Sequence, residues 1–472
     1  MSRSNKIAYS LCAIVVLAAI VAYAGLIPIG HWQDEFYTFY RLRDGGLTFM
    51  LQRLLTWSPR PLSELLVFVY GEIVLTTNKA LVGSALTVTW LLTALMMFAL
   101  PARFTTSFRT LVMLASVAVG ALFLLDHPTG EMFYWPVAAF AYMPAIAALA
   151  AVFWLAVLDG MVSSHARRAA AILLIIAACS IEIGAMFVFC MSGIAAVLFV
   201  APAHRREWRN MIWLIGPLII SAAILVLIYT GRVSHDEHMW GDATISHHFW
   251  RALKLALIVF FQDVLAPNWS ISSGTSIAFA VIGKAFTFIA FYGIARVVNS
   301  TKRESIRWLT VLSLTCAIVT YLTVAAALYQ FGHPSNGGRH DTFRQCLIYL
   351  SLISAACALG IRKGPIPHSE VAKFLGCLAI AVAIPFASSV KSIADDYARY
   401  AQFRAVKIAN WNRGYTSDRS MTYEQITPGK IVGGTSCVKD KTYTLTDPET
   451  WWWIEGVIKF FHKDAVTFKT VH

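Results

Sequence analysis

Residues 7–28 read IAYSLCAIVVLAAIVAYAGLIP, and HWQDEF follows shortly afterwards at 31–36. The first stretch is about twenty apolar residues long, which is enough for a helix to cross the hydrocarbon core of a bilayer. The acidic pair Asp34-Glu35 stands directly beyond it. Because a carboxylate costs free energy near hydrocarbon, a pair in this place marks a candidate functional site rather than a simple anchor.

Apolar segments recur along almost the whole chain. Of its 472 residues 57% are hydrophobic and 14% are charged, whereas about a quarter of the residues of a soluble domain are charged. We therefore predict an all-α polytopic membrane protein. The first segment is too long for the apolar core of a signal peptide and lacks a convincing cleavage site, so we expect it to remain as the first span.

The net charge of +13 is an orientation signal rather than a sign of nucleic-acid binding, because the two signs of charge fall in different loops. Basic residues cluster in short linkers: Arg3, Lys6, Arg103, Arg109, Arg167, Arg168, Arg205, Arg206, Arg209, Lys302, Arg303, Arg307, Arg362, Lys363 and Lys373. Acidic residues favour the opposite loops: Asp34, Glu35, Asp44, Asp126, Glu131, Glu182, Asp236, Glu237, Asp242 and Asp341. The positive-inside rule then places the amino terminus in the cytoplasm.

This orientation divides the chain into about eleven spans and an external carboxyl tail. The spans fall near 7–28, 80–100, 110–125, 136–158, 169–182, 184–201, 211–230, 276–297, 308–330, 343–360 and 373–390. The apolar run 169–201 would be roughly 50 Å long as one helix, far more than the bilayer core. We expect a hairpin that turns at 180–184, which puts Glu182 at the external surface.

Two regions lie outside the spans. Residues 29–79 form the first external loop of a transmembrane domain that covers 1–390, and we predict interfacial helices near 36–57 and 62–77. Residues 391–472 form an external extension. Its first part is predicted to prolong the last span as a helix, with Ile393, Tyr397, Tyr400 and Arg404 on one face. Turns and aromatic residues follow, and we expect Trp451, Trp452, Trp453, Phe460 and Phe461 to touch the membrane interface.

Neither cysteine nor histidine indicates a metal or disulfide framework. The eight cysteines lie mostly in apolar segments without a CxxC pair, which is typical of buried, inert thiols. Histidines at 235, 238, 247 and 248 are interpreted as solvated loop residues. We assign no metal ligand and no cofactor, while a need for a divalent cation stays open.

With this topology the unusual polar residues converge on one side of the membrane. They are Asp34, Glu35, Arg60, Glu131, Trp135, Tyr142, Glu182, Arg339, His340 and Arg344. Such groups suit a sugar joined to a lipid phosphate, since sugar transfer needs a base for the acceptor hydroxyl and cations for the leaving phosphate. Simpler interpretations stay open: the carboxylates can cap helices and Arg60 can reach lipid headgroups.

The same residues resemble the GT-C superfamily of integral-membrane glycosyltransferases. More narrowly, the chain is similar to the bacterial glucosyltransferases that convert O-antigen serotype in lipopolysaccharide. The matching features are Asp34-Glu35, Arg60-Pro61-Leu62, Glu131 with Trp135 and Tyr142-Met143-Pro144, and Glu182 followed by Gly184. The resemblance covers roughly 1–390, and the tail is shorter than the large carboxyl-terminal domains of oligosaccharyltransferases and arabinosyltransferases.

The resemblance implies transfer from a polyprenyl-phosphate sugar to a hydroxyl of a periplasmic glycan or lipid-linked acceptor, at the outer face of the bacterial inner membrane. Asp34 is the preferred catalytic base and Glu35 the second choice. Many relatives carry Asp-Asp where this chain has Asp-Glu, so either acid stays open as the base. Arg339, His340, Arg60 and Arg344 are expected to bind the donor phosphate. Glu131, Glu182, Trp135 and Tyr142 are expected to bind the sugar or acceptor.

Two other functions remain as alternatives. A transporter or lipid flippase is expected to carry charges in mid-span and paired repeats, whereas here the polar residues collect at one face and no repeat is visible. An O-antigen ligase or polymerase also uses lipid-linked glycans, but such enzymes usually have a large late loop with paired arginines. All three functions need membrane lipids as surroundings and none involves nucleic acid.

Overall fold

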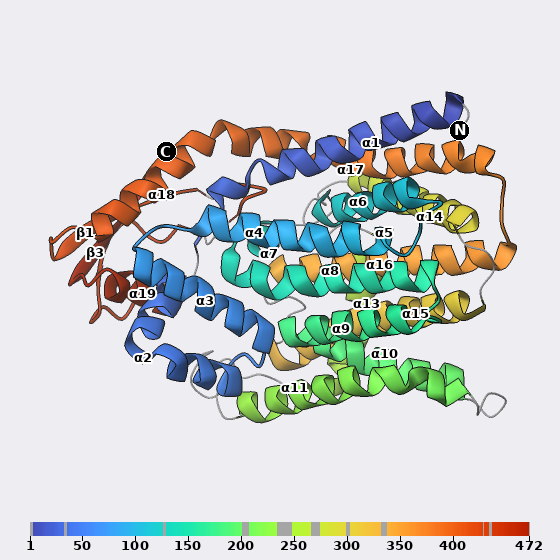
Figure 1. The fold of residues 1–472 in the computed structure, drawn as a ribbon. Coiled ribbons are helices and arrows are strands. Elements are labelled where there is room, and N and C mark those ends of the chain that lie inside the picture. The colour runs from blue at the N-terminus through green and yellow to red at the C-terminus, as the bar shows by residue number, and fades with distance from the viewer. Residues whose placement is uncertain are drawn as a thin grey trace.

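A computed structural model describes residues 3–32, 35–125, 129–200, 207–233, 248–265, 274–298, 303–331, 338–427, 429–433 and 437–471. Within these ranges the chain forms a bundle of long helices with a small mixed subdomain at one end (Figure 1). Nine segments are long and apolar enough to cross a membrane: Arg3–Ile29, Val82–Ala102, Pro136–Leu158, Glu182–Phe199, Met211–Thr230, Ile277–Val298, Arg303–Tyr329, Gly338–Lys363 and His368–Ala398. The chain is therefore a multi-pass membrane protein, as its composition predicts.

The elements of the first half are α1 (Arg3–Ala24), η1 (Ile27–Ile29), α2 (Glu35–Thr56), α3 (Pro61–Thr77), α4 (Val82–Ala94), η2 (Leu95–Ala99), α5 (Leu100–Ala102), α6 (Arg109–Leu125), α7 (Gly130–Phe133), α8 (Pro136–Leu158), α9 (Ser164–Ser180) and α10 (Glu182–Val200). The second half holds η4 (Glu207–Leu214), α11 (Ile215–Val233), α13 (Phe249–Leu265), α14 (Gly274–Val298), α15 (Arg303–Phe331), α16 (Gly338–Lys363), η5 (His368–Glu370), α17 (Val371–Ala398), α18 (Tyr400–Gly414) and α19 (Trp452–Phe460). Three strands complete the chain: β1 (Ser420–Ile426), β2 (Thr442–Thr444) and β3 (Ala465–Val471).

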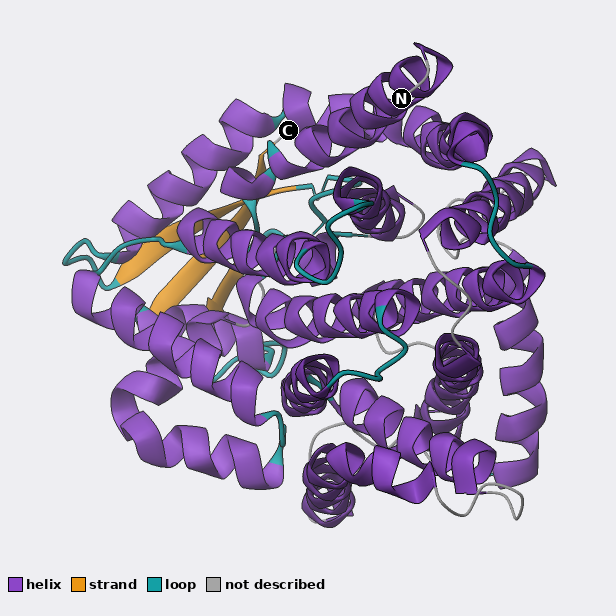
Figure 2. Cartoon of the chain, turned by 45° about the vertical axis from the view of Figure 1, so that its right-hand side comes forward, coloured by secondary structure: helices purple, strands orange, loops and turns teal. Residues whose placement is uncertain are grey.

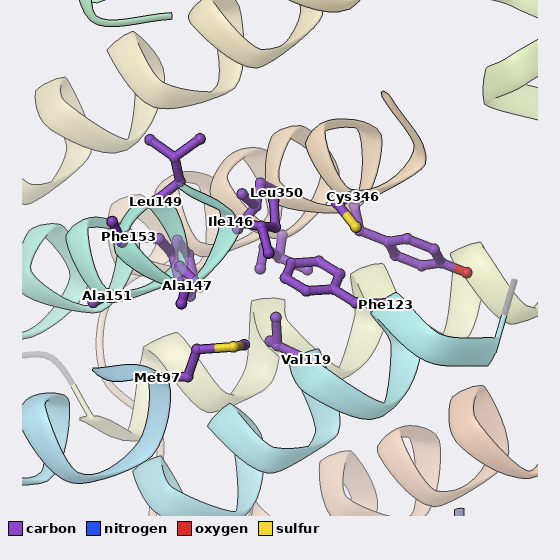
Figure 3. Packing of buried hydrophobic residues seen from close by; sticks show 14 of the residues in the cluster. Met97, Val119, Phe123, Ile146, Ala147, Leu149, Ala151, Phe153, Cys346 and Leu350 are labelled. Atoms are coloured by element: carbon purple, nitrogen blue, oxygen red, sulfur yellow. The ribbon is translucent and has the colours of Figure 1, made fainter. Parts of the chain in front are cut away.

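Helix α8 lies at the centre of the bundle and is buried on nearly all sides. Its sequence is apolar all round, which is typical of a central helix, and its many alanines let neighbouring helices approach closely. Figure 3 shows Ile146 and Phe153 of α8 among side chains from other helices, with Phe123 of α6 and Leu350 of α16 nearby. The core is therefore organised around one helix that the sequence marks by composition.

The apolar run 169–201 is interrupted where the hairpin is predicted. Helix α9 ends at Ser180 and α10 begins at Glu182, while Ile181 between them has extended backbone angles. A Cβ on Gly184 would lie 2.0 Å from the carbonyl oxygen of Ala177, so α10 starts in close contact with α9. The predicted break is confirmed. Since α6 and α9 have 17 residues each, the total of eleven spans stays a prediction.

Helix α13 is an element to which the sequence analysis assigns no span. It covers Phe249–Leu265 and packs on α15, where the Tyr321 hydroxyl donates to the carbonyl of Leu253 at 3.2 Å. Charged residues interrupt its apolar pattern, among them Arg251, Lys254 and Asp263. Hydropathy alone does not select such a segment, because burial of Asp263 depends on partners from other helices.

The loop at 29–79, predicted to be the first external loop, contains the two predicted helices, α2 and α3. Arg53 and Glu64 join them through a largely buried ion pair, with Nε and Oε2 2.8 Å apart. Each helix also leaves an apolar stripe exposed at a spacing of four residues: Leu47, Leu51 and Leu55 on α2, and Leu65, Val69 and Ile73 on α3. Exposed apolar stripes beside charged residues are typical of helices that lie in a membrane interface.

The two ends of the bundle bring different segments together. At the amino-terminal end Asn5 donates to the carbonyl of His368 at 3.0 Å, and Arg296 donates to the carbonyl of Gly364 at 2.9 Å. At the opposite end Thr129 donates to the carbonyl of Ile431 at 3.1 Å, which joins α7 to the carboxyl-terminal region. Figure 1 shows the amino terminus and the strands at opposite ends.

The carboxyl-terminal extension adds a small sheet to a chain that is otherwise helical, as the all-α expectation predicts for the bundle. It contains a three-stranded sheet in the order β1-β3-β2, with β1 parallel and β2 antiparallel to β3 (orange in Figure 2). Phe460 and Phe461 are 3% and 5% exposed and pack on Phe36, so they belong to a core rather than to the membrane interface. Trp451 remains 67% exposed. Only β2, with three residues, is short; β1 and β3 have seven residues each.

Candidate functional site

Arg60 and Glu182 form an ion pair between the first external loop and α10. Arg60 immediately precedes α3, whose first residue is Pro61, and Glu182 is the first residue of α10. Nε of Arg60 donates to Oε2 of Glu182 at 2.7 Å, and the side chains are 23% and 14% exposed. Burial alone would lower the pKa of Arg60, but the Glu182 carboxylate more than offsets this and raises it. The guanidinium therefore stays cationic.

Glu131 meets the amino-terminal end of α16. The backbone N–H of Arg339 lies 3.4 Å from Oε2 of Glu131, which belongs to the short helix α7. A carboxylate is stabilised there by the unpaired N–H groups and the helix dipole. The Arg339 guanidinium lies 5.2 Å from the ring centroid of Trp135, within the range of a cation–π contact. In the part of the chain that the structure describes, no carboxylate forms an ion pair with this guanidinium.

Tyr142 and His340 complete the group. The Tyr142 hydroxyl lies 3.3 Å from Nδ1 of His340, and the two rings meet edge to face at 5.8 Å. The charges of Arg60, Arg339, Glu131 and Glu182 all act on this hydroxyl.

We call Arg60, Glu131, Tyr142, Glu182, Arg339 and His340, with Trp135, the polar cluster. Its members come from four separate regions of the sequence, yet they meet at the end of the bundle that carries the carboxyl-terminal extension. The sequence analysis singles out all seven. What the structure adds is that they are neighbours.

Arg344 has a different position from the other predicted phosphate ligands. It is 2% exposed and lies between two carboxylates, with Nε 3.1 Å from Oδ2 of Asp263 and Nη2 2.7 Å from Oδ1 of Asp341. Its charge is therefore neutralised inside the bundle. The Gln345 amide and the Lys284 ammonium also donate to the backbone carbonyl of Asp263, each at 3.1 Å. Sequence reasoning missed Asp263 because it assigned α13 no place in the bundle.

Only Glu35 of the acidic pair lies among the residues that the structure describes. Asp34, the preferred base, lies outside the described residues. Glu35 begins α2 and is fully buried, and its charge acts on Lys407, Tyr70 and Tyr423. Glu35 therefore has a different set of neighbours from the polar cluster.

Lys407 of α18 is a residue that the sequence analysis did not select. Its ammonium donates to the carbonyl of Ile29 at 2.5 Å and to that of Gly30, and it lies 5.5 Å from the ring centroid of Trp32. Burial lowers the pKa of Lys407 to about 7, although the Glu35 carboxylate acts in the opposite direction. Lys407 lies one turn beyond Arg404 on the face predicted for this helix. Continuing that face by one more turn would have included Lys407.

His31 connects the end of the first span to the polar cluster. Its Nε2 lies 2.8 Å from the carbonyl oxygen of Gly130, and its ring stacks on Trp135 with centroids 6.4 Å apart. Burial is the largest effect on His31 and lowers its pKa to about 4, so the ring is neutral near pH 7. Because Trp135 also contacts Arg339, the end of the first span and the polar cluster are adjacent.

Of the four histidines interpreted as solvated, those at 235, 238 and 247 lie outside the described residues, and His248 is exposed just before α13. Among the residues that are described, no three His, Cys, Asp or Glu side chains are grouped as metal ligands. A comparison with models of protein families, with curated proteins and with solved structures finds no match for this chain. The site is therefore characterised by its own geometry.

Proposed function

We propose that this protein is a GT-C-type glycosyltransferase. It transfers a sugar from a polyprenyl-phosphate donor to a hydroxyl of a glycan or lipid-linked acceptor at the outer face of the bacterial inner membrane. The observation that supports this proposal is the polar cluster. Two guanidinium groups, two carboxylates, a tyrosine and a histidine meet at the end of the bundle opposite the basic linkers. This is the composition that a sugar phosphate requires.

The donor phosphate binds to Arg339, whose guanidinium has no carboxylate partner among the described residues. A guanidinium offers several N–H donors in one plane and suits phosphate oxygens. Arg60 uses Nε for Glu182 and retains its Nη groups for the same phosphate. Fixed cations of this kind stabilise the negative charge that grows on the leaving group in the transition state.

The sugar ring lies beside the carboxylates. Glu131 and Glu182 accept hydrogen bonds from its hydroxyls, while the Tyr142–His340 pair fixes the base of the site. Trp135 supplies an apolar surface next to Arg339. Because each carboxylate is also bound to a group of the protein, its position is set before the substrate arrives, which reduces the entropy lost on binding.

Asp34 is the proposed base. It removes the proton of the acceptor hydroxyl as the oxygen attacks the anomeric carbon of the sugar. The bond from that carbon to the phosphate oxygen breaks, and its electron pair leaves with the polyprenyl phosphate. Glu35 is buried against Lys407 and two tyrosines, so we assign it to positioning the loop rather than to proton transfer.

The test is the activity of Asp34→Asn in proteoliposomes that contain a polyprenyl-phosphate hexose and an acceptor glycan. We expect transfer to fall by about a hundredfold to ten-thousandfold, the usual contribution of one general base, because the nucleophile is not activated. The thermal unfolding temperature should stay unchanged. Asp44→Asn is the matched control, since Asp44 is an exposed carboxylate of the same loop. Near-normal transfer by Asp34→Asn would refute the assignment.

One observation favours the transporter or flippase alternative. Asp263, Lys284 and Arg344 are charged, buried and located among helices of the bundle, and charges within a membrane protein often line a transport pathway. Here Arg344 is paired with carboxylates, which also fits a structural role. The same proteoliposomes distinguish the two functions: a flippase moves the labelled donor across the bilayer unchanged, whereas a transferase yields a new glycosidic product.

A further inference from the structure

A cavity of about 130 Å³ lies between the first external loop and the carboxyl-terminal extension. Its walls come from the end of the first span, from α18 and from β1, with Trp453 of α19 on one side. The residues that give it its character are His31, Trp32, Phe36, Lys407, Tyr423 and Trp453. Neither the donor phosphate nor the sugar of the proposed mechanism occupies it, since those bind at the polar cluster.

The size of the cavity suits one six-membered ring. An engineered cavity of about 150 Å³ takes up benzene, while a single water needs only about 10–15 Å³. The wall combines aromatic faces with polar groups, which include Lys407, Asn410 and Glu424. An alkyl or prenyl chain would match only the aromatic part of this wall. A ring with apolar faces and a polar edge matches both parts of the wall.

The polar wall is held in place by the protein itself. Asn410 donates to the backbone carbonyl of Glu424 at 2.6 Å and accepts from its N–H at 2.9 Å, which fixes α18 against β1. Lys407 is bound to the carbonyls of Ile29 and Gly30. A binding site with fixed walls loses little entropy when a ligand enters.

We propose that this cavity is a carbohydrate site that binds one pyranose ring, namely the ring of the acceptor glycan that receives the transferred sugar. The second half of this statement rests on the proposed function, and the first does not. Aromatic faces pack against the C–H face of a pyranose, while its hydroxyls meet the polar wall.

The location of the cavity fits an acceptor. Its wall contains His31 and Trp32, and the next residues of the chain are Gln33, Asp34 and Glu35. On the other side His31 stacks on Trp135, which contacts Arg339 of the polar cluster. An acceptor ring in the cavity therefore lies at the end of the first span, with the donor site one aromatic side chain further on.

The experiment fills the cavity and measures sugar binding directly. Val406 lines the cavity, whereas the neighbouring Ala405 on α18 is exposed. We compare the full-length wild type, Val406→Trp and the matched control Ala405→Trp by saturation-transfer NMR. The probes are the methyl pyranosides of glucose, galactose, mannose and N-acetylglucosamine, and acyclic sorbitol is the negative probe.

We expect at least one pyranoside, and not sorbitol, to bind the wild type and Ala405→Trp. Binding to Val406→Trp should fall at least tenfold. Trp453→Ala removes one aromatic wall without placing a larger side chain in the cavity, and it should weaken binding at least fivefold. This variant replaces Val406→Trp in the test if Val406→Trp does not fold. The proposal is overturned if no pyranoside binds the wild type, or if the cavity variants bind as well as the control.

Transfer assays separate this proposal from the proposed function. If both hold, Val406→Trp raises the KM for the acceptor and leaves the KM for the polyprenyl-phosphate donor unchanged. Sugar binding in the cavity without any transfer by the wild type would reject the transferase and retain the carbohydrate site. Transfer by the wild type with no effect of Val406→Trp would retain the transferase and reject the cavity as the acceptor site.

Discussion

Two arginines on α16, Arg339 and Arg344, lie little more than one helical turn apart and have opposite surroundings. Arg344 is 2% exposed and lies between the carboxylates of Asp263 and Asp341. Arg339 stands at the start of the helix, with its guanidinium on the face of Trp135 and without a carboxylate partner in the described ranges. From the sequence, both arginines are predicted to bind the donor phosphate.

The difference shows how one residue type takes two functions. A guanidinium that is neutralised in a dry interior fixes helices to one another, because removal of either partner leaves a buried charge. A guanidinium whose charge is not balanced attracts an anion from outside. The four predictions below test this distinction in order of decreasing effect.

The largest effect is expected from Arg344→Ala. The change leaves the buried carboxylate of Asp263 without its cation, which typically costs about 3–5 kcal/mol. The free energy of unfolding in detergent should fall by that amount. Adding Asp263→Leu to Arg344→Leu removes both charges of that pair and should recover most of the loss. If Arg344→Ala unfolds like the wild type, the structural assignment of Arg344 is wrong.

Arg339→Ala should lower activity and leave stability nearly unchanged, the opposite of what we expect for Arg344→Ala. We expect sugar transfer to fall about a hundredfold to a thousandfold, as for the loss of one fixed group that stabilises transition-state charge. Thermal stability should hardly change, because no described carboxylate depends on its guanidinium. Arg339→Lys should restore part of the activity, since it keeps the charge and loses the planar fork. Equal losses of stability in Arg339→Ala and Arg344→Ala would contradict the assignment of different functions to the two arginines.

Glu182→Gln tests the intermediate case of a partly exposed pair. Arg60 would lose a charged hydrogen bond, a type that contributes about 1.5–3 kcal/mol, so its position over the donor phosphate would loosen. We expect transfer to decrease by about tenfold to a hundredfold. Glu304→Gln, at the opposite end of the bundle, is the matched control and should keep full activity. A neutral result for Glu182→Gln would remove this pair from the site.

The smallest effect, taken over one pH unit, concerns the neutral His31. Its pKa is lowered to about 4 by burial, against about 6.5 in the unfolded chain. The unfolded state therefore binds the proton first, and stability that is complete above pH 6.5 is lost as the pH falls toward 4. The slope is at most about 1.4 kcal/mol per pH unit.

Unfolding temperatures of wild type and His31→Gln, measured between pH 7 and 4, check this prediction. The variant should lack the contribution of His31, so the difference between the two proteins should change with pH. His165→Gln replaces an exposed histidine of α9 and should follow the wild type. Parallel curves for the wild type and His31→Gln would contradict a lowered pKa at this position.

Local patterns of the sequence determined most of the helical frame. Runs of apolar residues identify the nine candidate spans, and the break at Ile181 follows from the excessive length of 169–201. The charge pattern also placed Arg60, Glu131, Glu182 and Arg339 at one end, because basic linkers fix on which side each loop lies. These inferences succeed because hydropathy and charge act over one span at a time.

Only the tertiary structure decided which of these residues are partners. Arg60 pairs with Glu182 across 122 positions of sequence, and Arg344 pairs with Asp263 across 81. Lys407 of the carboxyl-terminal extension donates to carbonyls at the end of the first span. Both segments line the same cavity. A span's apolar pattern records that it is buried but not which helix it faces, so pairing and pocket geometry follow from packing of the whole chain.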